Sequence, residues 1–272
     1  AASGANFIPL AQSWPADLET PLTAWIKAGS GHPPGVLLES VEGGETLGRW
    51  SVIACDPLWT ASARGNLLQR RWRDGREDSL QGNPFETLRR CLAPYNCVSL
   101  PGLPPLGQLY GMWGYELIQW IEPTVPVHPR SSEDPPDGIW MLMDAILIFD
   151  QVKRQITAVA YADLSDGLGE DEAWELALDR IQSLKNRMNS PLPPVDPLRW
   201  DGTARNLPEV SSNRSQDEFE QAVLTAKDRI SAGDVFQLVI SQRLETKVQQ
   251  TPLELYRSLR MVNPSPYMAF FL

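Results

Sequence analysis

The pattern of hydrophobic and polar residues is most informative in the last sixty residues of the chain. Apolar residues recur at helical period over 219–230, which predicts an amphipathic helix that begins at the capping-box pair Ser215 and Glu218. Gly233 follows the last apolar residue, where a left-handed C-cap favours glycine. Residues 235–244 form a continuous, β-branched apolar run, so we expect an inner strand covered on both faces.

A second capped helix and a further strand follow. Thr251 and Glu254 repeat the capping-box spacing, and Pro252 suits the first turn of the predicted helix. The two prolines within 263–266 end this helix, because the residue before a proline is disfavoured in the α region. Residues 267–272 predict another buried strand, and the sequence ends inside it. We therefore predict that the chain is the front part of a longer protein.

The first 190 residues show a mixed pattern of short strands and helices. Strands are expected at 35–40, 49–54, 67–72 and 107–117, a buried strand pair at 139–149 and 155–161, and helices at 18–26, 84–92 (with Asn83 as cap) and 170–188. The glycines of 107–117 suggest that another group approaches that strand closely. Five prolines make 190–208 a natural linker.

Composition narrows the class of function. The chain has 272 residues, 42% of them hydrophobic and 21% charged, as in ordinary globular proteins. A net charge of −10 disfavours nucleic acid as a partner. The most apolar stretch, 139–149, is interrupted by Asp144 and is too short to cross a bilayer, so we expect no membrane partner. Three cysteines without metal spacing (Cys55, Cys91 and Cys97) indicate reduced thiols and a cytoplasmic location.

Candidate catalytic groups are few. The two histidines, His32 and His128, lie beside prolines in predicted loops and are interpreted as solvated rather than catalytic. No glycine-rich phosphate-binding motif appears. Gln237, Gln242 and Arg243 are the polar groups expected to point from the predicted strand at 235–244, and solvation or backbone pairing explains them more simply than substrate contact.

Two groups of motifs resemble the anthranilate synthase component I family of chorismate-utilising enzymes. In the last quarter of the chain these are GDVFQ at 233–237, SQR at 241–243, PLELYR at 252–257 and NPSPYM at 263–268. Near the front they are LLES at 37–40, RWSVI at 49–53 and DP at 56–57, which are similar to the N-terminal domain of the glutamine-amidotransferase-dependent members.

This resemblance implies a fold and a domain order. The expected fold is α+β: two large, mostly antiparallel β-sheets packed face to face with helices on the outside, truncated in this chain. The implied domains are an N-terminal regulatory domain over 1–190, a linker over 191–210 and the incomplete start of a chorismate-binding catalytic domain over 211–272.

The resemblance also implies a tryptophan pocket formed by two distant segments. A strand end with a hydroxyl and a carboxylate suits an ammonium group, and a Pro-Tyr-Met surface suits an indole ring. Taken alone, Glu39 and Ser40 are explained more simply as a strand that leaves the core and turns polar, and the Pro-Tyr-Met segment is also explained as a turn packed on a strand. Carried over by motif position, the effector contacts are Ser40, Pro266, Tyr267 and Met268, with Glu39, Arg49 and Ser51 as further candidates.

The implied activity is that of the large subunit of anthranilate synthase, feedback-inhibited by tryptophan. Such a subunit converts chorismate and ammonia to anthranilate and pyruvate, with a glutamine amidotransferase subunit as ammonia donor and Mg²⁺ holding the substrate carboxylate. Catalytic and metal-ligating residues are expected beyond Leu272. The alternatives are aminodeoxychorismate synthase component I and a tryptophan-sensing module without catalysis.

Overall fold

The computed structural model describes residues 4–40, 48–104, 107–127, 131, 134–198 and 208–272. The chain divides into two compact units, one formed by Ala1–Val195 with Arg260–Leu272 and the other by Asp196–Leu259. The predicted catalytic segment 211–272 is thus shared between the units, because its final strand belongs to a sheet of the first.

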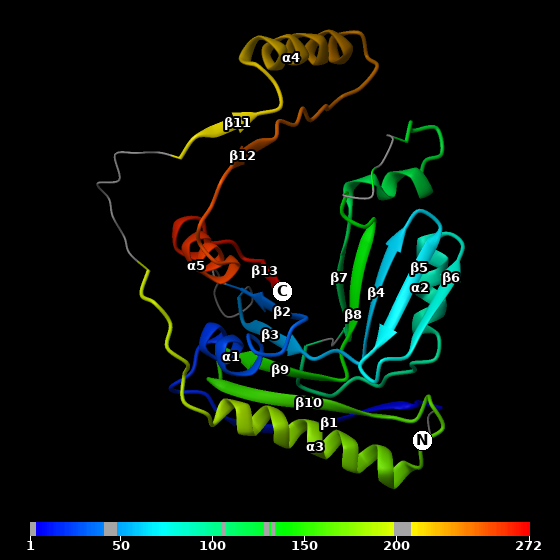
Figure 1. Ribbon diagram of the computed structural model, residues 1–272, viewed down its shortest axis with the longest axis vertical. Helices are drawn as coiled ribbons and strands as arrows, with labels where there is room; N and C mark the ends of the chain where they lie inside the picture. The colour runs from blue at the N-terminus through cyan, green and yellow to red at the C-terminus, as the bar shows by residue number, and fades with distance from the viewer. Residues whose placement is uncertain (1–3, 41–47, 105–106, 128–130, 132–133, 199–207) are drawn as a thin grey trace. The chain divides into compact units, whose positions relative to one another are not determined.

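The first unit contains a six-stranded antiparallel sheet in the order β1-β10-β9-β3-β2-β13 (Figure 1). Its strands are β1 (Phe7–Pro15), β2 (Gly35–Glu39), β3 (Trp50–Cys55), β9 (Ala145–Asp150), β10 (Gln155–Asp163) and β13 (Met268–Phe271). Neighbours separated by more than two hundred residues pair directly, since Met268 lies opposite Glu39 and Phe271 opposite Val36. The strands predicted at 35–40, 49–54 and 267–272 are present, while β1 carries no clear pattern in the sequence.

A second antiparallel sheet in this unit has the order β6-β5-β4-β8-β7. It consists of β4 (Trp59–Arg64), β5 (Leu67–Trp72), β6 (Glu77–Gln81), β7 (Leu109–Trp113) and β8 (Gly138–Leu142). The predicted single strand at 139–149 is therefore wrong, because the chain leaves one sheet at Leu142 and enters the other at Ala145. The hairpin of β9 and β10 agrees with the predicted pair.

The two sheets pack against each other through a shared core. Tyr110 and Met141 of the second sheet belong to the same buried cluster as Val36, Ile148 and Val159 of the first. Apolar side chains on both faces of β9 and β10 are buried, because the opposite face of the sheet is covered by helices. These antiparallel layers with helices outside them confirm the predicted α+β fold class.

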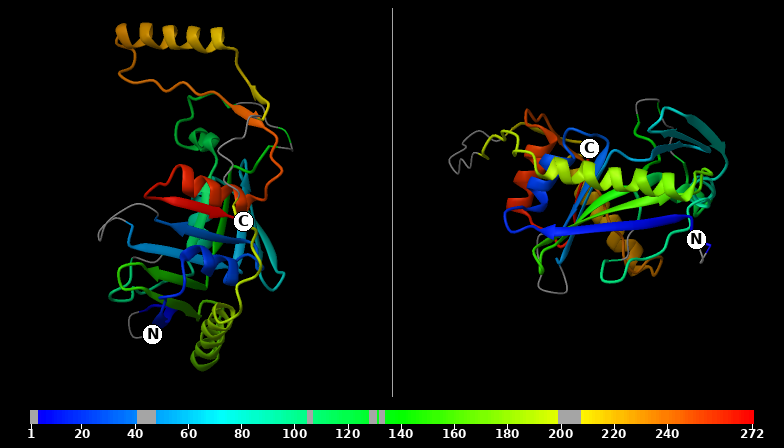
Figure 2. Two further views of the ribbon diagram at one scale, coloured as in Figure 1. Left: turned by 90° about the vertical axis from the view of Figure 1, so that its left-hand side faces the viewer. Right: turned by 90° about the horizontal axis from the view of Figure 1, so that it is seen from below.

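Helices cover the outer faces of both sheets. α1 (Pro21–Ala28) and α3 (Glu170–Met188) lie against the first sheet, and Figure 2 shows α3 running along it. α2 (Pro84–Leu92) covers the second sheet, where Leu88 and Cys91 join the cluster around Trp59. Asn83 caps α2 as predicted by accepting a hydrogen bond from the Phe85 amide at 2.9 Å. A short 3₁₀ helix, Tyr115–Trp120, follows β7.

A glycine in β7 makes room for an indole ring. A Cβ placed on Gly111 would lie 2.2 Å from the Ile139 carbonyl oxygen and 2.5 Å from the Trp140 ring. Trp113 packs edge-on against the same Trp140, with ring centroids 4.6 Å apart. This close approach agrees with the expectation drawn from the glycines of 107–117.

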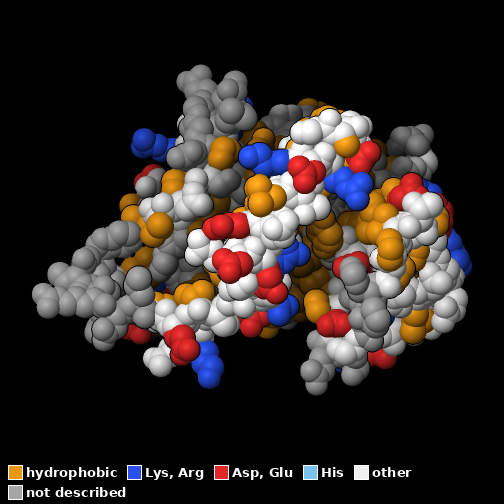
Figure 3. All heavy atoms as spheres, turned by 90° about the horizontal axis from the view of Figure 1, so that it is seen from above, with side chains coloured by type: hydrophobic (Ala, Val, Ile, Leu, Met, Phe, Trp, Pro, Cys, Tyr) orange, Lys and Arg blue, Asp and Glu red, His pale blue; other side chains and the backbone are white. Residues whose placement is uncertain are grey.

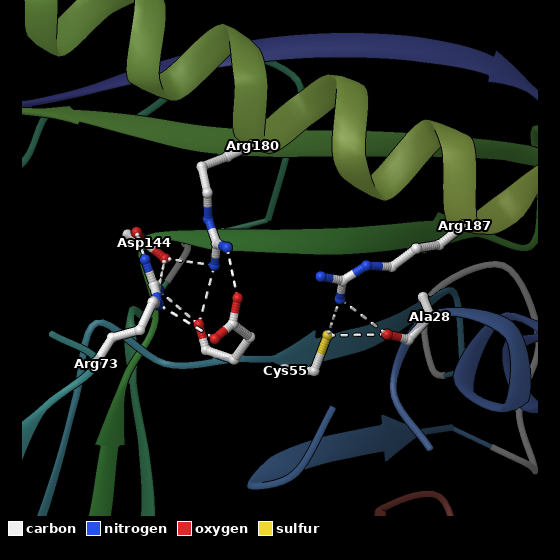
Figure 4. Close-up of polar contacts among 7 residues, drawn as sticks. Ala28, Cys55, Arg73, Asp144, Arg180 and Arg187 are labelled. Carbon is white, nitrogen blue, oxygen red and sulfur yellow. Dashed lines mark hydrogen bonds and ion pairs between the residues drawn. The ribbon is translucent and has the colours of Figure 1, made fainter. Parts of the chain in front are cut away.

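Four charged side chains join the two sheets at the point where strands pass from one to the other (Figure 4). Asp56 follows β3, Asp144 lies between β8 and β9, and both carboxylates contact Arg73 and Arg180. Arg180 donates to Asp56 at 2.6 Å and to Asp144 at 3.0 Å. The network therefore fixes α3 and the end of β5 to the two connections between the sheets, from β3 to β4 and from β8 to β9.

The second unit contains α4 (Gln216–Ser231), two three-residue strands, β11 (Val210–Ser212) and β12 (Leu244–Thr246), and most of α5 (Pro252–Val262). The capping box of Ser215 and Glu218 forms as predicted, and Gly233 has the predicted left-handed φ of +83°. The inner strand predicted at 235–244 is wrong: residues 235–243 form no strand, and Phe236 is 95% exposed. An apolar run becomes an inner strand only where neighbours pair with it, and among the described residues β12 pairs only with β11.

Hydrophobic side chains remain visible at the surface in Figure 3. In α4 and the segment after it, the exposed hydrophobic side chains include those of Leu224, Phe236 and Val239. Across the described parts of the chain, no helix combines the length and apolar character needed to cross a bilayer.

Candidate functional site

The end of β2 and the start of β13 lie side by side at one edge of the first sheet. β2 ends at Glu39, and β3, its neighbour in the sheet, begins at Trp50. β13 begins at Met268, after the two prolines of 263–266 that end α5 at Val262 as predicted. The antiparallel register of Met268 with Glu39 then brings the LLES and NPSPYM motifs together.

A cavity of about 520 Å³ lies between these two segments. Its lining is made of Leu38, Glu39, Ser40, Gly48, Arg49, Trp50, Val52, Pro266, Tyr267, Met268 and Ala269. All of these residues belong to the first compact unit. Six of the seven residues predicted for the effector site therefore border one cavity, and Ser51 does not.

Ser40 and Tyr267 are the two predicted residues best placed to meet a ligand. The Ser40 hydroxyl donates a 2.6 Å hydrogen bond to the carbonyl oxygen of Pro266. Tyr267 is 82% exposed, so its ring is open to contact rather than buried in the core. The cavity thus has a polar end at Ser40 and an aromatic side at Tyr267.

Strand alternation divides the remaining predicted residues between the two faces of the sheet. Glu39 and Met268 are register partners and share the face of Phe270, which packs edge-on against Trp25 of α1. Glu39 is 3% exposed, and its carboxylate accepts two hydrogen bonds from Arg260 at 2.9 and 2.8 Å. The Glu39 carboxylate is therefore already engaged on the helical face.

Ser51 lies on the same helical face and is buried. Its hydroxyl is 3.4 Å from Nε2 of Gln151, which also donates to the Ser40 carbonyl oxygen at 3.3 Å. This arrangement makes Ser51 a support for the end of β2 and leaves its side chain away from the cavity.

Arg49 is a cation at the rim of the cavity. Its guanidinium donates to both carboxylate oxygens of Asp150, at 3.1 and 2.7 Å, and lies 4.4 Å from the centre of the Trp50 ring. Burial alone would raise the pKa of Asp150, but hydrogen bonds from Arg49 and from the backbone amides of Lys153 and Val152 outweigh it and lower that pKa. The fixed guanidinium suits an anionic group of a ligand.

Other candidate groups stay outside this cavity. His32 is exposed after α1, and burial together with the charge of Arg187 lowers its pKa, while His128 lies outside the described residues. Gln242 donates to Ser212 at 2.8 Å, and Arg243 pairs with Glu245 at 2.7 Å. Both are exposed, as is Gln237. Their described contacts are thus local ones within the second unit.

The described residues do not form a metal site. No group of three or more His, Cys, Asp or Glu side chains in these parts of the chain lies close enough to hold a metal ion. Cys55 and Cys91 are buried, and no described cysteine forms a disulfide.

Comparison with known proteins places the chain in a family. The model of the chorismate binding enzyme family matches residues 42–272. The chain belongs to the chorismate binding enzyme family. The match begins two residues after Ser40, so the LLES motif at 37–40 adds to it independently.

Relatives of known activity extend this assignment over the whole chain. Anthranilate synthase component 1 of Synechocystis sp. is 49% identical over 275 residues, covering 98% of this chain and 54% of that protein. The protein of the same name from Pseudomonas aeruginosa is 35% identical over 277 residues, covering 100% of this chain and 55% of the relative. This member of the chorismate binding enzyme family thus spans about half the length of the relatives it matches.

A solved structure shares the fold. Anthranilate synthase component I from Streptococcus pneumoniae matches with a TM-score of 0.59 and 24% sequence identity, covering 80% of this chain and 46% of that chain. The likeness supports the paired antiparallel sheets described above.

Proposed function

We propose that this chain supplies the regulatory region and the beginning of the catalytic domain of an anthranilate synthase large subunit. The activity is the conversion of chorismate and glutamine-derived ammonia to anthranilate and pyruvate, a step of tryptophan biosynthesis in the cytoplasm. Membership of the chorismate binding enzyme family and the similarity to proteins named anthranilate synthase component 1 support this activity.

Tryptophan is the proposed effector of the cavity between β2 and β13. The observation that carries this proposal is the hydrogen bond between Ser40 and Pro266, which joins the two motif segments at one cavity. Exposed Tyr267 and the neighbouring Trp50 offer aromatic surface to an indole ring. This combination of one polar end and one aromatic side suits an aromatic amino acid.

The charges at the cavity suggest how the two ends of the amino acid are held. Arg49 at the rim suits the carboxylate, since its guanidinium is already oriented by Asp150. The ammonium group needs oxygen acceptors, and the Ser40 hydroxyl and the Pro266 carbonyl supply them. Glu39 is no longer the expected ammonium ligand, because its carboxylate is paired with Arg260.

Feedback follows if tryptophan prefers one arrangement of the chain. A ligand shifts an equilibrium only as far as its affinities for the two arrangements differ. Pro266 and Tyr267 lie in the segment between the end of α5 at Val262 and the start of β13 at Met268. Contacts at the cavity therefore favour one conformation of the segment that follows α5.

The partners of this activity are also part of the proposal. A glutamine amidotransferase subunit supplies ammonia, and Mg²⁺ orients the carboxylate of chorismate. We place the catalytic residues and the Mg²⁺ ligands outside these 272 residues.

An assay of the complete gene product tests the activity. With chorismate, Mg²⁺ and ammonia, we expect anthranilate and pyruvate, and tryptophan should inhibit their formation. Aminodeoxychorismate as the product would assign the chain to the folate pathway, and tryptophan binding without turnover would leave a sensing module. The isolated 272-residue chain is expected to be inactive, so anthranilate formation by it would contradict the proposed location of the active site.

A further inference from the structure

The end of β2 is attached at two points to the segment that connects α5 with β13. Glu39 accepts two hydrogen bonds from Arg260, which lies in the last turn of α5. Ser40, the next residue, donates to the carbonyl of Pro266, just before β13. We call residues 260–268 the α5–β13 reversal. The reversal is thus held at Arg260 by the last residue of β2 and at Pro266 by the residue that follows this strand.

The two attachments lie on opposite faces of the sheet. Consecutive residues in a strand point to opposite faces, so Ser40 faces the cavity while Glu39 faces the helical side. Arg260 accordingly borders a different, polar cavity that includes Phe149 and Gln151, and it does not line the cavity of Tyr267. The pair of Glu39 and Arg260 therefore contacts the reversal on the face of the sheet opposite the candidate effector site.

The geometry of this pair restricts motion of the reversal. The side chain of Glu39 is 1% exposed and that of Arg260 is 28% exposed. A buried carboxylate is costly without a partner, so the bonds to Arg260 persist. Two parallel hydrogen bonds fix the orientation of the guanidinium as well as its position. The last turn of α5 is consequently fixed relative to β2.

We propose that Glu39 is a positioning residue for the effector cavity. It holds Arg260 so that the reversal presents Pro266 and Tyr267 to the cavity, and it does not itself contact the effector. The naming of tryptophan as the effector rests on the proposed function; the positioning of the reversal does not.

Hydrogen exchange of the ligand-free chain tests the positioning directly. Glu39→Gln and Arg260→Gln should each accelerate exchange of backbone amides within 261–268 by about tenfold or more. The double variant should exchange no faster than either single one, because all three lack the same interaction. Arg257→Gln, an equal change of charge one turn earlier in α5, should leave exchange in this region unchanged, since Arg257 donates to the Asp196 carbonyl, away from the reversal. Unchanged exchange in both single variants, or effects that add, would overturn the proposal.

The double variant keeps the positioning role testable even if a single variant fails to fold. Either single change leaves one unpaired charge, whereas Glu39→Gln with Arg260→Gln removes both charges together. If a single variant fails to fold, the double variant must still show faster exchange within 261–268 than the original chain. Exchange equal to that of the original chain would contradict the positioning role.

Calorimetric titration with L-tryptophan separates positioning from direct contact. Positioning predicts that Arg260→Gln weakens binding by about fivefold or more, to the same extent as Glu39→Gln. An effector contact at Glu39 would instead weaken binding in Glu39→Gln alone, which would overturn the proposal. Failure of the original chain to bind tryptophan would reject the proposed function, and the exchange experiment would then decide the positioning role by itself.

Discussion

Ser40 and Pro266 are 226 residues apart in sequence, yet the hydroxyl of one donates a 2.6 Å hydrogen bond to the carbonyl of the other. This contact joins the end of β2 to the start of β13 and places the LLES and NPSPYM motifs around one cavity. Its consequence is that a small ligand can touch both the early part of the chain and the segment that leads out of α5.

The exposed ring of Tyr267 should contribute to binding but not to folding. Tyr267→Ala removes a side chain that is 82% exposed, so the melting temperature should stay nearly unchanged while tryptophan affinity falls about tenfold. Tyr267→Phe, which keeps the ring, serves as the control and should bind within about threefold of the original chain. Calorimetry and thermal melting measure the two effects. Full affinity in Tyr267→Ala would show that the aromatic side of the cavity is not used.

Phe270, three residues later, should show the opposite behaviour. It is 7% exposed and packs against Trp25, with ring centroids 5.7 Å apart. Phe270→Ala should therefore lower the free energy of unfolding by about 3 kcal/mol, as large-to-small changes in a core do. Urea denaturation measures this loss, and a stability equal to that of Tyr267→Ala would contradict the assigned faces of β13.

Arg49 and Asp150 should make part of the stability dependent on pH. The pKa of Asp150 is lowered in the folded chain, so the unfolded chain binds the proton more readily. The resulting stabilisation is present above the ordinary pKa of an aspartate and is lost as the pH falls through the lower, folded pKa. Arg49→Gln removes the main opposing interaction, and acid unfolding followed by circular dichroism should then begin at a higher pH. An unshifted acid transition would show that the backbone amides alone hold the carboxylate.

The network of Asp56, Arg73, Asp144 and Arg180, where the chain passes between the two sheets, should stabilise the fold. Arg180→Met leaves Asp56 and Asp144 with only Arg73 as a described cation partner, and we expect a loss of about 2–3 kcal/mol in the free energy of unfolding. Arg89→Met is the matched control, because Arg89 pairs with Glu86 on an exposed helix surface. Chemical denaturation of both variants tests the difference. Equal effects in the two variants would mean that this network adds no stability.

The three cysteines should react slowly with thiol reagents. Burial is the largest cause of the raised pKa of Cys55, Cys91 and Cys97, and the thiolate is the reactive form. In the folded chain at pH 7, an aromatic disulfide reagent should label them far more slowly than in urea, where all three become accessible. Immediate labelling of three thiols in the folded chain would contradict the packing of these residues.

The sequence predicted helices more reliably than strands for a physical reason. The helices α2, α4 and α5 carry their own start signals in the caps Asn83, Ser215 and Thr251, each of which bonds an amide two or three residues away. Strands depend on partners elsewhere in the chain, so residues 235–243 fail to form one despite their apolar pattern. The same dependence hides the break at Asp144, because the apolar residues on either side of it belong to strands of different sheets.

The candidate site was accessible to sequence reasoning only through its motifs. Composition and periodicity give no reason to bring Ser40 near Tyr267, because their proximity follows from the pairing of β2 with β13. Periodicity does contain one unused signal: alternation along 36–40 places Glu39 on the face opposite Ser40. Its partner Arg260 requires the fold, since the two are 221 residues apart.

Calorimetric titration of L-tryptophan into the original chain and its Ser40→Ala variant tests the central claim most directly. We expect one saturable site in the original chain and an affinity at least about tenfold weaker in Ser40→Ala. L-Phenylalanine, titrated as a control, should bind more weakly than tryptophan to both chains. Equal tryptophan affinity in the two chains, or no saturable binding in the original chain, would contradict an effector site at the junction of β2 and β13.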